Sequence, residues 1–108
     1  MTCITVARAD PQQLWQDHAQ SVDWYRKAAE QGYTTAQMNL GIKYARGEGV
    51  PQDYFEARKW LSLAIAGGAL SAKRALEYFA EGMSREQIAA GDRSALEWRD
   101  AHSHNAAP

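Results

Sequence analysis

The sequence predicts an all-α protein, a short right-handed α/α solenoid of antiparallel helix hairpins. A shift of 36 positions matches seven residue pairs: Gln16/Gln52, Asp17/Asp53, Trp24/Trp60, Ala28/Ala64, Gly32/Gly68, Ala36/Ala72 and Leu40/Leu76. Five of these positions, 24, 28, 32, 36 and 40, lie four residues apart, which is the spacing of one helix face. The only β-leaning stretch, residues 4–6, is too short to build a sheet. Hairpins that repeat every 36 residues stack side by side.

Start and stop signals predict five helices, at residues 17–31, 34–46, 53–66, 70–81 and 84–101. Four starts have the capping-box spacing, in which a short polar residue is followed three positions later by Glu or Gln: Asp17 and Gln20, Thr34 and Gln37, Asp53 and Glu56, Ser84 and Gln87. Glycine tolerates the left-handed conformation at a helix end, so stops are expected at Gly32, Gly47 to Gly49, Gly67 to Gly68, and Gly82. Asp10-Pro11 either starts a further turn or extends the first helix backwards.

The length of 108 residues and the net charge of −1 fit one small domain. We divide the chain into a candidate N-terminal cap at 1–16, a repeat region at 17–82, a C-terminal capping helix at 83–101 and a disordered tail at 102–108. Only one repeat is complete, whereas each solenoid repeat buries its apolar face only against a neighbour. The N-terminal end is therefore expected to be capped by residues 1–16, or to dock against a partner or a second copy.

A dense motif lies between residues 36 and 60. It comprises Leu40-Gly41 followed by Tyr44, the turn 47–50, Asp53, and an alanine at 57 three positions before Trp60. In order and spacing it closely resembles the Sel1-like repeat (SLR) family, relatives of tetratricopeptide repeats, and the resemblance covers residues 17–80. It implies a helical solenoid that recognises proteins without catalysis. Gly41 costs stability inside a helix, so it predicts a helix crossing at which even a methyl group would clash.

No constellation in the sequence predicts catalysis, a cofactor or a metal site. The turn Gly47-Glu-Gly49 lacks the remaining features of a phosphate-binding loop. A single cysteine excludes a disulfide within the chain and multi-thiolate zinc sites. The only candidate metal ligands among the histidines are His18, His102 and His104, too few and too scattered to predict a site. The single cysteine, Cys3, has no paired histidine in a recognisable nucleophile motif.

The resemblance places the ligand-facing positions beside Leu40 and Leu76, because the first helix of each hairpin lines the concave side in such stacks. These positions are Thr35, Asn39, Ile42, Lys43 and Arg46 on the helix 34–46, and Ser71, Arg74, Ala75 and Tyr78 on the helix 70–81. We select five of them as partner-binding residues: Asn39, Lys43, Arg46, Arg74 and Tyr78. Guanidinium and amide groups suit an acidic peptide. The alternative is that these cations are merely solvated.

The sequence therefore predicts a protein–protein interaction module or adaptor. A self-associating solenoid is the alternative, with Leu14 and Trp15 pairing two chains through the uncapped N-terminal end. A hydrolase relic is a third hypothesis. The near-neutral charge argues against a nucleic-acid module, and no apolar run reaches the length of a membrane helix. Without a basic leader followed by an apolar segment, we expect a cytoplasmic protein.

Overall fold

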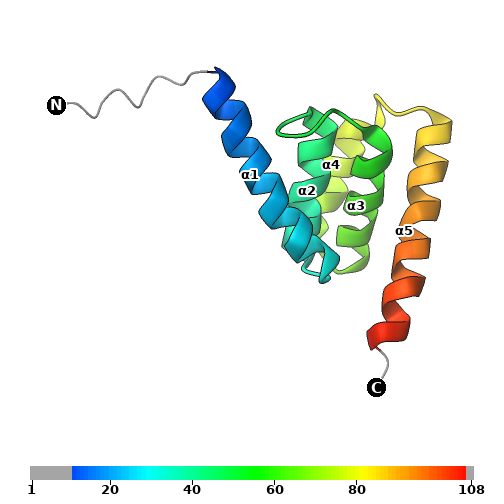
Figure 1. Cartoon of the computed structure of the whole chain (residues 1–108). Helices are drawn as coiled ribbons and strands as arrows, with labels where there is room; N and C mark the ends of the chain where they lie inside the picture. The colour runs from blue at the N-terminus through cyan, green and yellow to red at the C-terminus, as the bar shows by residue number, and fades with distance from the viewer. Residues whose placement is uncertain (1–10, 107–108) are drawn as a thin grey trace.

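The computed structural model describes the backbone of residues 11–106 and the side chains of residues 16–102. It consists of five helices, α1 (Pro11–Glu30), α2 (Thr34–Arg46), α3 (Tyr54–Ala66), α4 (Leu70–Ala80) and α5 (Arg85–Ala106), with no strand among the described residues. Figure 1 shows α1 to α4 as successive antiparallel helices, with α5 beside α3. The prediction of an all-α solenoid of helix hairpins is confirmed.

Two of the four predicted capping boxes set helix starts as expected. The Asp53 carboxylate accepts hydrogen bonds from the N–H groups of Phe55 and Glu56, at 3.0 and 3.2 Å. At α5, the Ser84 N–H donates to Gln87 Oε1 at 2.9 Å, and the Gln87 N–H donates to Ser84 Oγ at 3.0 Å. These bonds satisfy N–H groups that have no partner within the helix.

The other two predicted capping boxes, at Asp17 and Thr34, are not formed, and these predictions are wrong. Asp17 lies inside α1, because that helix already begins at Pro11, as the backward-extension alternative allowed. Proline suits the first helical position, where its missing N–H would be unpaired in any case. At α2 the N-cap is Tyr33, which makes no side-chain cap bond. Gln37 instead donates from Nε2 to the Ala29 carbonyl at 3.2 Å, and so joins α2 to the end of α1.

The last helix is longer than predicted. It continues to Ala106, whereas the sequence placed its end at 101 and a disordered tail beyond it. The added turn contains His102, whose ring stacks on Trp98 with centroids 3.6 Å apart. His102 Nδ1 also lies 2.8 Å from the Trp98 carbonyl oxygen. This pairing of residues four apart explains why the helix passes 101.

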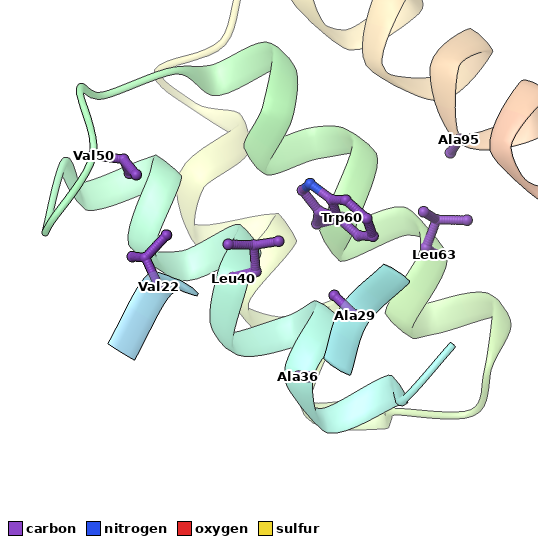
Figure 2. Packing of buried hydrophobic residues seen from close by; sticks show 8 residues of the cluster. All are labelled: Val22, Ala29, Ala36, Leu40, Val50, Trp60, Leu63 and Ala95. Atoms are coloured by element: carbon purple, nitrogen blue, oxygen red, sulfur yellow. The ribbon is translucent and has the colours of Figure 1, made fainter. Parts of the chain in front are cut away.

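The core divides into two clusters that run through the stack. The first joins α1, α2, α3, α5 and the turn 47–53, and its buried members, drawn in Figure 2, are Val22, Ala29, Ala36, Leu40, Val50, Trp60, Leu63 and Ala95. The second lies between α2, α3, α4 and the start of α5, and its buried members are Ala45, Ala57, Leu61, Ala64, Ala72, Leu76 and Met83. Each hairpin is therefore buried only through its neighbours, as expected of a solenoid.

Two glycines permit close approach within the stack. A Cβ on Gly41 would lie 2.8 Å from Leu61 Cγ and 3.2 Å from the Ala57 carbonyl oxygen, so the predicted close crossing is confirmed, and the helix crossed is α3. Gly49 has φ +81°, and its Cβ would lie 2.5 Å from the His18 carbonyl carbon. The turn 47–53 thus rests directly on the backbone of α1.

The closing helix packs on α3 rather than building a hairpin with α4. Arg58 of α3 donates from Nε and Nη2 to the two carboxylate oxygens of Asp92, at 2.8 and 3.2 Å. Gly91 lies at the same crossing, where a Cβ would come within 2.6 Å of Arg58 Cβ. The outer face of α4 consequently remains exposed, and it is mostly polar: Leu70, Lys73, Arg74, Glu77 and Tyr78.

Candidate functional site

The predicted partner-binding residues of α2 and α4 lie on different parts of the surface of these two helices. Met38 of α2 packs toward α4, with Ser71 Oγ 3.3 Å from its sulfur. Asn39 and Arg46, seven residues apart, lie on one side of α2, and Arg46 is exposed. On α4, Tyr78 is 75% exposed. Its ring meets Phe79 edge-on, with centroids 5.0 Å apart.

Arg74 lies on the part of this surface that α4 contributes. The repeat makes position 74 equivalent to position 38, whose side chain points to the next first helix in the stack. Arg74 is exposed accordingly, and it lies toward the uncovered side of α4. The guanidinium groups of Arg46 and Arg74 therefore lie on different parts of the predicted surface.

Lys43 is placed differently, because it turns toward α1. Its Nζ lies 2.6 Å from His18 Nδ1 and 3.8 Å from Glu48 Oε1, and 16% of its side chain is exposed. The ammonium group thus joins α1, α2 and the turn 47–53. Lys43 is therefore not part of the partner-binding face that we propose for α2 and α4.

A second polar connection holds α1 against α2. The Tyr44 hydroxyl oxygen lies 3.1 and 2.9 Å from the two terminal nitrogens of Arg26 and accepts a hydrogen bond from this guanidinium. The Arg26 guanidinium carbon also lies 5.8 Å from the Tyr44 ring centroid. Burial raises the pKa of Tyr44, and the positive charge of Arg26 opposes that rise without cancelling it.

The raised pKa predicts a loss of stability in alkali. The folded state holds the Tyr44 proton more tightly than the unfolded chain, whose tyrosine pKa is about 10. The contribution is complete below pH ~10 and disappears as the pH rises through the folded-state pKa. Melting temperatures measured between pH 9 and 11.5 should fall less steeply for Tyr44→Phe than for the wild type. Equal slopes for the two proteins would contradict this assignment.

A groove that the sequence did not predict opens between α1 and α2. It has a volume of about 660 Å³ and is mainly apolar, lined by Trp24, Tyr25, Ala28, Tyr33, Thr34, Thr35, Ala36 and Asn39. Trp24 is 72% exposed and Tyr33 64% exposed. The signal that could have revealed the groove is the repeat itself, since Trp24 matches Trp60, which is only 4% exposed.

The remaining candidates do not assemble into a chemical site. Among the side chains that the structure describes, no three His, Cys, Asp or Glu residues come together to hold a metal ion. His18 is engaged with Lys43, and His102 with Trp98. Leu14, Trp15, His104 and Cys3 lie outside the described side chains. Within the described part of the chain, no helix is both long and apolar enough to span a membrane.

Comparison with known families identifies the repeat. The family model named Sel1 repeat matches residues 15–33 and residues 34–68. The chain belongs to the Sel1 repeat family. No curated protein matches it. Sel1 repeats generally serve as protein–protein interaction modules and are typically non-catalytic.

Each of the two matched ranges corresponds to particular helices of the structure. The second match, residues 34–68, covers the α2–α3 hairpin and so is one whole Sel1 repeat. The first match, residues 15–33, covers part of α1 and the turn after it. It therefore corresponds to the second helix of a Sel1 repeat, and the groove lies on the side where that repeat would have its first helix.

Proposed function

We propose that this chain is a non-catalytic adaptor that binds a peptide or protein partner on the face formed by α2 and α4. The Sel1 repeat supports the general role, because modules of this family mediate protein interactions. The exposed Tyr78, 75% accessible and oriented by Phe79, is the observation that carries the choice of face. Tyrosine and arginine are enriched among the residues that dominate binding energy at protein interfaces.

The charge of this face favours an acidic partner. Arg46 lies at the end of α2 and Arg74 on α4, both exposed, and Asn39 adds an amide on the same side of α2 as Arg46. A guanidinium can hold a carboxylate through two parallel hydrogen bonds, so each arginine supplies one anchor for an Asp or Glu side chain. A short acidic peptide that spans the two helices would use both anchors.

Selection from a random peptide library tests this proposal. The wild-type chain should enrich acidic peptides, and Arg46→Glu combined with Arg74→Glu should weaken their binding at least tenfold, since a charged hydrogen bond contributes about 1.5–3 kcal/mol. The control is Arg85→Glu combined with Arg93→Glu, which makes the same charge change on exposed positions of α5. Enrichment of peptides without acidic residues, or equal losses in both double variants, would contradict the proposal.

Self-association is a second candidate function. The exposed Trp24 at the N-terminal end favours it, since a large exposed apolar residue beside a groove is common at association sites. We predict that Leu14 and Trp15 would contribute to such a homodimer. We also propose a cytoplasmic location, supported by the single cysteine.

A further inference from the structure

The groove between α1 and α2 has a filled counterpart in the same chain. The 36-residue repeat makes Tyr25, Ala28 and Ala36 equivalent to Leu61, Ala64 and Ala72. The latter three are fully buried, and they pack in one cluster with residues of α2. Tyr25 and Ala28 are only half-buried. In the second repeat, α2 is therefore the helix that packs on these three positions.

The first repeat differs from the second in the segment that precedes its second helix. In the second repeat, residues 47–53 reverse the chain between α2 and α3. The equivalent residues 11–17 are part of α1, which continues through them as a helix. Among the described residues, the chain therefore does not reverse before α1 in the way that it reverses between α2 and α3.

We propose that this groove binds an amphipathic helix of a partner protein, seated as α2 is seated on α3 and α4. This surface lies at the end of the stack and goes beyond the α2–α4 face proposed above. The second cluster defines the helix that fits, because α2 enters it through Met38, Ile42 and Ala45. Gly41 lies between them, where a Cβ would meet Leu61. The partner helix thus needs apolar residues at positions i, i+4 and i+7 and a glycine at i+3.

The polarity beside the groove limits the partner to one helix. In the second repeat, Leu63 is 3% exposed and belongs to the first cluster. Its equivalent in α1 is Lys27, which is exposed, and Asp23 and Gln20 beside it are exposed too. A second partner helix that covered Lys27 would have to bury its charge, which is unfavourable. A single partner helix leaves the polar side chains of Lys27, Asp23 and Gln20 exposed to water.

The chain's own α4 does not meet these requirements. In the repeat, α4 occupies the same position as α2 and is exposed on its outer face, so it is the natural candidate in a head-to-tail pair of copies. However, Glu77 stands where Gly41 stands in α2, and Arg74 and Glu81 replace Met38 and Ala45. A glutamate would not fit the crossing, and two further charges would enter an apolar groove. These differences favour a different protein over a second copy.

A peptide with the sequence of residues 34–46 is the defined probe. We would hold it helical with a lactam bridge between positions 35 and 39, because an isolated helix of this length is marginal in water. Fluorescence anisotropy of the labelled peptide with the full chain should show saturable binding. Gly41→Leu in the peptide should weaken binding at least tenfold. In the protein, Ala28→Glu and Trp24→Ala should each do the same.

The controls separate this groove from other surfaces. Ala89→Glu places the same charge on an exposed position of α5, and Leu96→Ala removes an exposed apolar side chain from the same helix; neither should change peptide binding. Trp24→Ala keeps the test valid if Ala28→Glu perturbs folding. Because Arg46 and Arg74 do not line the groove, failure of this test leaves the acidic-peptide proposal standing, and the reverse holds as well.

Three outcomes would overturn the proposal. The first is no saturable peptide binding at concentrations up to about 1 mM. The second is binding that Ala28→Glu and Trp24→Ala leave unchanged, which would mean that the peptide displaces α2 from its own site. The third is a homodimer in light scattering that Ala28→Glu dissociates, because a second copy would then occupy the groove.

Discussion

Replacing Trp60 by alanine is expected to lower the free energy of unfolding by about 3–5 kcal/mol, the usual cost of removing a buried tryptophan. Trp60 is 4% exposed and packs edge-on against Trp98, with ring centroids 6.0 Å apart. Its Nε1 donates to Glu56 Oε1 at 3.1 Å. The loss is a large part of the ~5–15 kcal/mol that holds a typical domain together. Urea denaturation followed by far-ultraviolet circular dichroism measures it.

Trp24→Ala is the matched control, since the repeat places Trp24 and Trp60 at equivalent positions. Trp24 is 72% exposed, so its removal should change the free energy of unfolding by no more than about 0.5 kcal/mol. A similar cost for both variants would show that Trp24 is covered in solution. A small cost for Trp60→Ala would contradict the packing of Trp60 against Trp98.

Gly49→Ala is expected to cost about 2–4 kcal/mol, combining backbone strain with overlap between the added methyl group and α1. At φ +81° an L-residue is strained, and the new Cβ would lie 2.6 Å from both the Ala19 nitrogen and the His18 carbonyl oxygen. Backbone atoms of a helix cannot move aside as a flexible side chain can. The turn must therefore lift off α1, and the burial of Val50 against Val22 is lost. Urea denaturation again provides the measurement.

Gly32→Ala separates the two causes. Gly32 has φ +96°, and a Cβ there meets nothing within 4 Å, so this variant carries the backbone strain alone. Gly49→Ala should be less stable than Gly32→Ala by about 1–3 kcal/mol, the typical cost of overpacking. Equal stabilities would mean that the turn and α1 are not in contact.

The helices of the complete repeat were predictable because their signals are local. The bounds of α2 agree with the predicted 34–46, and α3 differs only in that Asp53 caps the helix from outside. The clash at Gly41 was also predictable, because a glycine inside a helix costs stability unless a close crossing requires the missing Cβ. The helix bounds thus follow from nearby residues, whereas the glycine indicates a close crossing without naming the helix that it meets.

Features that depend on distant parts of the chain were harder to predict. Thr34 and Gln37 have the capping-box spacing, yet Gln37 bonds to Ala29 because α1 ends beside it. Lys43 was predicted to face a ligand, and nothing near it in the sequence indicates that its ammonium group lies next to His18 of α1. The position of α5 on α3 depends on Arg58 and Asp92, which are 34 residues apart. Such pairings follow from tertiary packing, which spacing along the chain does not encode.

The central position of α3 has a consequence for how the molecule loses its structure. Helix α3 packs against α2, α4 and α5, whereas α1 packs chiefly against α2. A simple repeat array unravels from its ends, because each unit touches only its neighbours. Here α5 packs on α3, so α2, α4 and α5 all depend on contacts with α3. These four helices should therefore unfold together. Amide protons of α1 should then exchange with solvent before those of the other helices, which makes its inner face the part of the core most readily opened.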